Sequence, residues 1–234
     1  MKRSCAVGPR YSPRRRATFH RALLVVAALV ALAGCGGGGS NRAATNTRTV
    51  SPPEARPGAT GACPVTGKQV SIPPLDPTKT YTVTARTNLG VFAFTLDLED
   101  SPCTSASFAA LVRKKFFDGT RFHRIVPGFV IQGGDPTGTG TGGPGYSVVD
   151  APPETARYTK GVVAMAKTGA EPAGTAGSQF FVVTAADAGL PPDYALLGKV
   201  TRGLPVVERI GKLGNPANEQ PTRRIVVETM TVSP

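Results

Sequence analysis

The chain has 234 residues and carries 27 lysine and arginine residues against 15 aspartate and glutamate residues, a formal net charge of +12. Seven of the basic residues lie in residues 1–34, a segment that we expect to be removed, which leaves 20 basic against 15 acidic residues, or +5. So small a charge gives no reason to expect nucleic-acid binding. After residue 34 the only histidine is His123, which excludes a metal centre built from several imidazoles.

Residues 1–34 have the organisation of a bacterial export signal. Residues 1–21 contain seven basic and no acidic residues, and residues 22–33 are an unbroken apolar run. This run is shorter than the ~20 residues that span a bilayer and is typical of a signal peptide. It ends in "LAGC", residues 32–35, which resembles the lipobox of bacterial lipoproteins, a family in which the signal is cut before the cysteine. The resemblance implies a lipid on Cys35. An ordinary signal, an uncleaved anchor and a twin-arginine export route stay open.

Residues 36–60 are rich in Gly, Ser, Thr, Asn, Pro and Arg and contain almost no large apolar side chain. Such a segment buries too little surface to offset its ordering entropy, so we expect a disordered, flexible tether. Residues 61–78 are rich in proline but include several apolar residues, and we expect this extension to pack along the domain that follows. These apolar residues are Val65, Val70, Ile72 and Leu75.

The cysteines sort by position. Cys5 lies in the signal and Cys35 is the candidate for lipidation, which leaves Cys63 and Cys103. In an oxidising compartment an even pair can form a disulfide. Two unrelated thiols are the alternative.

From residue 79 to residue 234 the pattern predicts one globular domain built mainly from short strands. The runs 81–86 and 91–98 alternate at the strand period on either side of a turn, which indicates a hairpin. Many short strands with only two helices predict a mainly β fold, a closed eight-stranded antiparallel barrel. The other expected strands are 121–126, 129–134, 161–166, 179–184, 194–200 and 224–232.

Two helices are expected in this domain. The first has Ser101 as its N-cap and Pro102 at its first position, and it ends at Asp118–Gly119. Its apolar stripe comprises Phe108, Leu111, Val112 and Phe116. The second helix covers residues 204–213.

Three common chemistries find little support. The glycine- and threonine-rich segment 136–147 lacks the Gly-Lys-Ser/Thr of a phosphate-binding loop, so we expect a connection between strands. Ser178 and His123 are the only candidate pair for hydrolysis, and the serine is not in a nucleophile-elbow motif. No Cys-x-x-Cys or carboxylate cluster indicates a metal site.

"FHRIVPGFVIQGGD", residues 122–135, sets a basic residue inside an apolar hairpin. In a regular strand Phe122, Arg124 and Val126 share one face. Pro127–Gly128 suits a type II turn, which splays its flanking strands, as at a barrel corner.

Burying the Arg124 guanidinium without a partner would be costly, and Gln132 and Gln179 are amides that can position it. The pattern alone leaves two interpretations open. Arg124 either bridges an acid in a structural role or belongs to a functional site.

These motifs carry a resemblance to a known family. "FHRIVPGFVIQGGDPTGTGTGGPGY" (122–146) and "GSQFFVVT" (177–184) resemble cyclophilin-type peptidyl-prolyl isomerases, and the likeness extends over roughly residues 80–232. The resemblance implies an eight-stranded barrel closed by two helices. It also implies isomerisation of X-Pro bonds in proline-containing polypeptides, with no cofactor and no metal, and we expect a monomer.

The resemblance assigns roles position by position. Arg124 matches the catalytic arginine, and Gln132 matches the glutamine that orients it and contacts substrate. The remaining matches bind substrate: Phe129, Val130, Phe181 and Leu190 at the proline ring, Tyr194 where some members have histidine, and Ala166 and Gln179 along the groove.

The chain also departs from the family. It has no tryptophan, so the tryptophan beside the family's pocket is absent, and weak cyclosporin binding is expected. Residues 167–177 are longer than the usual connection and lack its asparagines, which leaves the preference for the residue before proline open.

The combined expectation is a lipoprotein, anchored to the membrane through its N-terminal lipid, that assists the folding of exported proteins outside the cytoplasm. One alternative is a catalytically weak chaperone or peptide-binding lipoprotein. Another is an adhesion or scaffold lipoprotein whose tether and anchor are the working parts.

Overall fold

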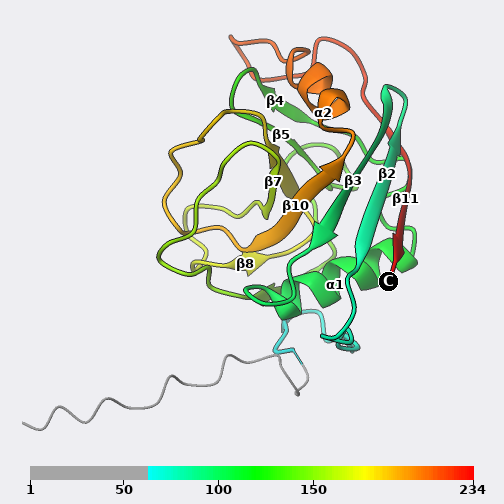
Figure 1. The fold of residues 1–234 in the computed structure, drawn as a ribbon, viewed down its shortest axis with the longest axis vertical. Coiled ribbons are helices and arrows are strands. Elements are labelled where there is room, and N and C mark those ends of the chain that lie inside the picture. The colour runs from blue at the N-terminus through cyan, green and yellow to red at the C-terminus, as the bar shows by residue number, and fades with distance from the viewer. Residues whose placement is uncertain (1–62) are drawn as a thin grey trace, which may run out of the picture. The chain divides into compact units, whose positions relative to one another are not determined.

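The computed structural model describes residues 63–234. The expected signal peptide, the lipidation site Cys35 and the tether lie outside these residues. Eight antiparallel strands form one strongly curled sheet (Figure 1). The strands are β2 (Thr82–Thr87), β3 (Gly90–Leu96), β4 (Arg124–Val126), β5 (Val130–Gly133), β7 (Val162–Met165), β9 (Phe180–Val183), β10 (Leu196–Arg202) and β11 (Val227–Ser233).

The strand order in this sheet is β11-β2-β3-β10-β7-β9-β5-β4. The two end strands are linked through the isolated bridge between Arg121 and Val226, where the Phe122 N–H donates to the Ile225 carbonyl over 3.1 Å. The predicted architecture of eight antiparallel strands and two helices is confirmed. The sheet curls into a half-barrel whose edges meet at this bridge, without a full hydrogen-bonded ladder between them.

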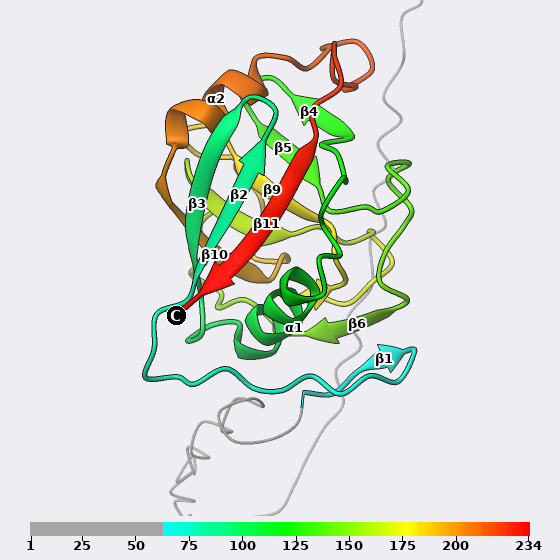
Figure 2. The same ribbon diagram turned by 90° about the vertical axis from the view of Figure 1, so that its right-hand side faces the viewer.

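The helices α1 (Pro102–Arg113) and α2 (Leu204–Gly211) lie at opposite ends of the curled sheet (Figures 1 and 2). The interior between them holds six phenylalanine rings, which pack in edge-to-face and offset pairs, the closest with centroids 4.6 Å apart. All of these rings are at most 1% exposed: Phe92, Phe94, Phe108, Phe117, Phe122 and Phe180. The main core therefore lies on the concave side of the sheet.

The first helix starts where it was predicted but ends early. It stops at Arg113, before Asp118–Gly119, because Lys115 takes a left-handed φ of 56° that a helix cannot continue. This turn brings Phe117 into the core, where it is fully buried. Ser101 is the N-cap residue and Pro102 follows it, as predicted, but the Ser101 side chain makes no capping hydrogen bond. The Ser101 carbonyl accepts the first helical hydrogen bond, from the Ser105 N–H over 2.9 Å.

The hairpin of β4 and β5 differs from expectation in its pairing. The turn is present, because the Phe129 N–H donates to the Val126 carbonyl over 3.0 Å and Gly128 has a φ of +72°, as a type II turn requires. The expected splaying is wrong, since Arg124 lies opposite Gln132 and pairing continues to the turn.

The strand period also breaks at the start of this hairpin. Phe122 and Ile125 are both fully buried in the main core, although they are three residues apart. Regular strand geometry begins only at Arg124, so the prediction that Phe122 shares a face with Arg124 is wrong. The irregular residues before β4 let Phe122 enter the core while Arg124 stays on the convex side.

A second sheet was not predicted. Its strands β1 (Thr66–Gly67), β6 (Tyr146–Val149) and β8 (Thr175–Ala176) join the N-terminal extension, the end of the glycine-rich segment and the long 167–177 connection. Two-residue strands leave no periodic signal in a sequence.

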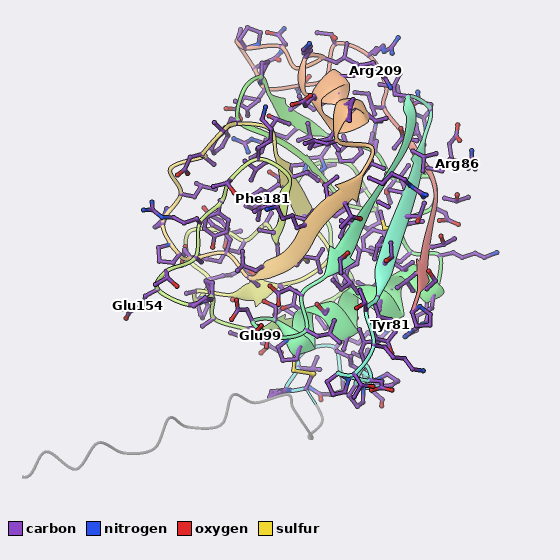
Figure 3. The ribbon with its side chains drawn as sticks, in the orientation of Figure 1. Tyr81, Arg86, Glu99, Glu154, Phe181 and Arg209 are labelled. Carbon is purple, nitrogen blue, oxygen red and sulfur yellow. A yellow bond between two sulfur atoms is a disulfide. The ribbon has the colours of Figure 1, made fainter. Side chains whose placement is uncertain are left out.

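The extension is also attached through its side chains. Ile72 is 6% exposed within the main core, and Val65, Val70 and Leu75 pack against it. A disulfide joins Cys63 to Cys103 of α1, with 5.4 Å between the Cα atoms, visible as the yellow bond below the helix in Figure 3. Neither helix within residues 63–234 combines the length and the apolar character that crossing a membrane requires.

We predict that opening this disulfide lowers the free energy of unfolding by up to about 4 kcal/mol. The bond joins residues 40 positions apart, and closing a loop of that length reduces the entropy of the unfolded chain. The double variant Cys63→Ser/Cys103→Ser should melt roughly 10 °C lower in calorimetry. Reductant should lower the Tm of the wild type and leave that of the double variant unchanged. Equal Tm values for the two proteins would contradict the prediction.

Candidate active site

The register of the sheet aligns one row of residues across four strands. Arg124 on β4 lies opposite Gln132 on β5, Gln132 lies opposite Phe181 on β9, and Phe181 lies opposite Ala164 on β7. Cross-strand partners project from the same face of a sheet. Their neighbours Ile131, Phe180 and Val182 point into the main core, so this row lies on the convex face. The fold thus sets a cation, an amide and an aromatic ring side by side.

The Arg124 guanidinium is held at two of its nitrogens. Its Nε donates to Glu219 Oε2 over 2.6 Å, and its Nη1 donates to Gln132 Oε1 over 3.3 Å. A guanidinium has five N–H donors, and within residues 63–234 the other three have no hydrogen-bond partner. The side chain is 36% exposed, so the expectation of a buried cation is wrong and its desolvation cost is modest.

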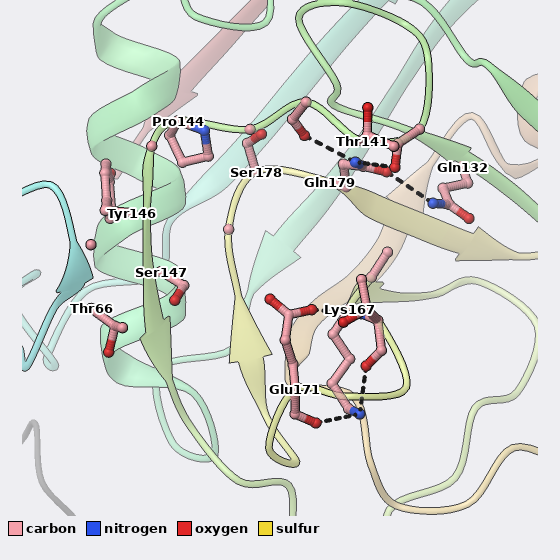
Figure 4. Close-up of a pocket in the computed structure, with 18 residues that line it drawn as sticks. Thr66, Gln132, Thr141, Pro144, Tyr146, Ser147, Lys167, Glu171, Ser178 and Gln179 are labelled. Atoms are coloured by element: carbon pink, nitrogen blue, oxygen red, sulfur yellow. Dashed lines mark hydrogen bonds between the residues drawn. The ribbon is translucent and has the colours of Figure 1, made fainter.

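A second amide fixes the orientation of the first. Gln132 Nε2 donates to Gln179 Oε1 over 3.0 Å, and Gln179 Nε2 donates to the carbonyls of Gly140 and Gly142 over 2.9 and 3.0 Å (Figure 4). The two carbonyls can only accept hydrogen bonds, so the Gln179 amide nitrogen must face them and its oxygen must face Gln132. Gln132 then presents its own oxygen to Arg124, so every donor and acceptor in this chain has one possible direction.

Asp135 holds the glycine-rich segment that supplies these carbonyls. Its buried carboxylate accepts backbone N–H bonds from Thr137, Thr139, Gly140 and Gly142, at 2.6 to 3.1 Å. Burial alone would raise the pKa of Asp135, but hydrogen bonds from Thr137, Gly142 and Gly140 outweigh it and hold that pKa well below its usual range. A Cβ on Gly142 would lie 2.0 Å from the carboxylate, so that position requires glycine.

Asp135 was not among the predicted site residues. The sequence signal for its role is an aspartate followed by a run of glycine and threonine, which favours backbone-to-carboxylate turns.

A second apolar cluster lies on the convex face beside this row. Phe181 belongs to this cluster and is 4% exposed. Its ring packs edge-to-face against the Tyr194 ring, with centroids 5.5 Å apart. The structure brings together in this cluster all the apolar residues that the resemblance assigned to substrate binding, and Figure 3 marks Phe181 among them. These residues are Phe129, Val130, Ala166, Phe181, Leu190 and Tyr194.

Tyr158 supports this cluster from below and was not predicted. It is fully buried, its hydroxyl donates to the Tyr194 carbonyl over 2.6 Å, and it accepts the Tyr194 N–H over 3.0 Å. Burial raises the pKa of Tyr158, so its hydroxyl keeps its proton at neutral pH. The backbone of Tyr194 is therefore held by a residue 36 positions earlier in the chain.

A pocket of about 580 Å³ shares the residue Ala166 with this cluster. Figure 4 shows the pocket. Gln132 and Gln179 line one wall, and Thr66 of β1 lines another, so the N-terminal extension takes part in this pocket. Lys167 also lines it, but its side chain is 3% exposed and its ammonium lies 2.7 Å from the Asp193 carboxylate. The pocket is therefore lined mainly by neutral groups.

The hydrolytic alternative is not supported by the geometry. The Ser178 hydroxyl donates to the Gly134 carbonyl over 2.7 Å and is buried. Neither ring nitrogen of His123 has a hydrogen-bond partner among the described residues, and burial lowers the pKa of His123. In the same part of the chain no group of three or more His, Cys, Asp or Glu side chains is arranged to hold a metal.

The curled eight-stranded sheet, with an arginine–glutamine pair beside an apolar cluster on its convex face, defines a cyclophilin-like class of protein. Residues 82–232 match the family model described as cyclophilin type peptidyl-prolyl cis-trans isomerase/CLD. The chain belongs to this family. It is a peptidyl-prolyl cis-trans isomerase, and proline-containing peptides are its substrates.

Two known relatives carry the same family description. Peptidyl-prolyl cis-trans isomerase A of Mycobacterium tuberculosis is 37% identical over 175 residues, which cover 67% of this chain and 94% of that protein. The human peptidyl-prolyl cis-trans isomerase-like 1 is 37% identical over 155 residues, 64% of this chain and 91% of that protein.

A crystal structure of a Cryptosporidium parvum cyclophilin type peptidyl-prolyl cis-trans isomerase superposes with a TM-score of 0.60 at 29% identity, over 67% of this chain and 99% of that one. A second structure of that protein was determined in the presence of the dipeptide Ala-Pro, with a TM-score of 0.59 at 29% identity, over 65% of this chain and 99% of that one.

We predict that Asp135→Asn lowers stability at neutral pH by about 2–4 kcal/mol, because an amide leaves buried N–H groups without an acceptor. The folded pKa of Asp135 lies below its unfolded value of about 3.9, so its stabilisation is complete above that value and is lost as the pH falls through the folded pKa. Urea unfolding should therefore show a constant gap between wild type and variant above about pH 5, narrowing in acid. Asp76→Asn, at an exposed carboxylate that accepts two hydrogen bonds from Thr78, should lower stability much less, because the amide keeps one oxygen acceptor and the site is open to water. A gap that widens in acid would contradict this prediction.

Proposed function

We propose that this isomerase catalyses the rotation of X-Pro bonds through Arg124, and that it acts on proteins folding outside the cytoplasm. The observation that carries the first part is the position of the guanidinium. It lies in the same cross-strand row as Phe181, is oriented by Gln132, and keeps three N–H donors without protein partners among residues 63–234.

The chemistry needs no nucleophile. Amide resonance imposes a barrier of ~18–20 kcal/mol on rotation, and unaided X-Pro bonds take tens to hundreds of seconds to isomerise. In the twisted transition state the prolyl nitrogen has lost conjugation and can accept a hydrogen bond. The Arg124 guanidinium supplies that donor, and it stabilises the twisted amide more than the planar one.

The apolar cluster completes the site. A proline ring packed on Phe181, between Phe129 and Leu190, places the bond before it near the Arg124 end of the row. The adjoining pocket then receives residues on the N-terminal side of the proline, bordered by Ala166 and Gln179. The parasite cyclophilin studied in the presence of Ala-Pro supports an X-Pro segment as the ligand.

Glu219 bears on the alternative that Arg124 merely bridges an acid. The acid is present, but it accepts only from Nε and leaves both hydrogens of Nη2 and one of Nη1 without a partner in the described region. A partly exposed cation with free donors beside an apolar cluster favours the functional interpretation.

The proposed location outside the cytoplasm is supported mainly by the N-terminal residues. The basic segment, the apolar run and the "LAGC" box support export and lipidation at Cys35. The disulfide between Cys63 and Cys103 supports the same location, because such bonds persist in oxidising compartments. On this proposal the protein assists the folding of exported proline-containing proteins near the membrane surface.

We predict that Arg124→Ala lowers kcat/KM about 100-fold in a protease-coupled assay with a proline tetrapeptide, because one preorganised donor to a transition state is worth on the order of 100- to 1000-fold. Circular dichroism should stay unchanged. Arg86→Ala, at an exposed arginine of β2 marked in Figure 3, should keep full activity. Undiminished turnover by Arg124→Ala would remove the assigned role.

We predict that the full-length protein, expressed in a bacterium, incorporates labelled fatty acid and sediments with membranes, and that Cys35→Ala abolishes the label. Cys5→Ala serves as a matched control within the expected signal and should keep the label. Labelling that survives Cys35→Ala would contradict lipidation at this residue.

A further inference from the structure

The loop between α2 and β11 places an acidic side chain against the proposed catalytic arginine. Glu219 Oε2 accepts from Arg124 Nε over 2.6 Å, although the two residues are 95 positions apart. This distance is at the short end for a charge-assisted hydrogen bond. The matches that assigned roles to Arg124 and Gln132 assigned none to Glu219.

The backbone of Glu219 is built into the fold at this point. Its carbonyl accepts the Ile125 N–H over 2.7 Å, directly beside Arg124, and its own N–H donates to the Asn215 carbonyl over 2.7 Å. The loop is closed by a bridge between Gly214 and Pro221. These contacts attach the loop to the β4 edge, so the carboxylate position depends on the strand that carries Arg124.

Glu219 also has a backbone conformation that few side chains adopt. Its φ is +59°, and within residues 63–234 the only other non-glycine residue with a positive φ is Lys115. Glycine or asparagine would occupy the left-handed region at lower cost. The loop therefore tolerates strain at the residue whose side chain reaches the guanidinium.

We propose that Glu219 is a positioning residue that sets the orientation of Arg124 for catalysis. Glu219 accepts a hydrogen bond from Nε, and Gln132 accepts one from Nη1. Two acceptors on different nitrogens of one planar group prevent the guanidinium from rotating. The remaining N–H donors, one on Nη1 and two on Nη2, are then held in fixed directions. This inference rests on the proposed catalytic role of Arg124.

A control is needed to separate the position of Glu219 from the general effect of removing a surface ion pair. Exposed pairs contribute little to stability. Lys160 and Glu208 form such a pair at 2.9 Å, with side chains 43% and 39% exposed, close to the 36% and 46% of Arg124 and Glu219. The Glu208 pair is therefore a matched control, since it has the same charges and similar exposure away from the row of Arg124.

The test compares three variants of the whole protein with wild type. Glu219→Asn suits the left-handed backbone but is too short to reach Nε, whereas Glu219→Gln keeps an oxygen acceptor at the same length. Glu208→Ala removes the matched pair. kcat and KM are measured separately by NMR exchange on a proline peptide over a range of concentrations, and Tm by calorimetry.

We expect Glu219→Asn to lower kcat about tenfold with KM within about twofold, because small misplacements of a catalytic group cost on the order of tenfold to 100-fold. Glu219→Gln should recover kcat to within about threefold of wild type, and Glu208→Ala should match wild type. The Arg124 Nε–H signal, assigned by its absence in Arg124→Lys, should exchange slowly in wild type and fast in Glu219→Asn.

The remaining outcomes distinguish the role of Glu219 from that of Arg124. Wild-type or higher kcat in Glu219→Asn, with Arg124→Ala inactive, overturns the role of Glu219 and leaves that of Arg124 standing. A change confined to KM also overturns it, because it would make Glu219 a substrate contact. Full activity in Arg124→Ala overturns the proposed function and this inference together. If Glu219→Asn fails to fold, Glu219→Gly takes its place in the same measurements, because glycine adopts a positive φ and offers no acceptor to Nε.

Discussion

The directional chain of hydrogen bonds that ends at the Arg124 guanidinium is the constraint on which this site depends. It starts at the buried Asp135 carboxylate, which shapes the glycine-rich segment, and passes through Gln179 and Gln132. Each amide can take only one orientation, because the carbonyls at its start accept and never donate. An arginine side chain has many rotamers, and this chain, with Glu219 on the other side, selects one of them.

The curled sheet separates stability from function by the alternation of its strands. On β9, Phe180 and Val182 point into the main core, while Phe181 and Val183 belong to the convex cluster. The same four residues thus pack the core on one face and the proposed substrate-binding cluster on the other. The backbone of β9 therefore serves both the core and the candidate site, and the register that aligns Arg124 with Gln132 also places Phe180 in the core.

Local patterns predicted the regular elements and failed where the chain departs from a repeat. The 81–98 hairpin appears as β2 and β3, with boundaries shifted by one or two residues. The strand period breaks at Phe122, whose ring is buried in the core. Helix α1 ends early because Lys115 has a left-handed φ, and the turn that follows buries Phe117. The strands β1 and β8 are too short to leave a pattern, so the second sheet and its wall of the pocket could not be anticipated.

The sequence alone determined the mainly β character of the domain, the position of its two helices and the identity of the Arg124–Gln132 pair. Strand alternation, turn glycines and eight-residue motifs are local, and local signals survive in a linear chain. Only the tertiary structure decided that Asp135, Tyr158 and Glu219 support the site. Their contacts join residues up to 95 positions apart and depend on which atom donates, and neither property is written in the order of the residues.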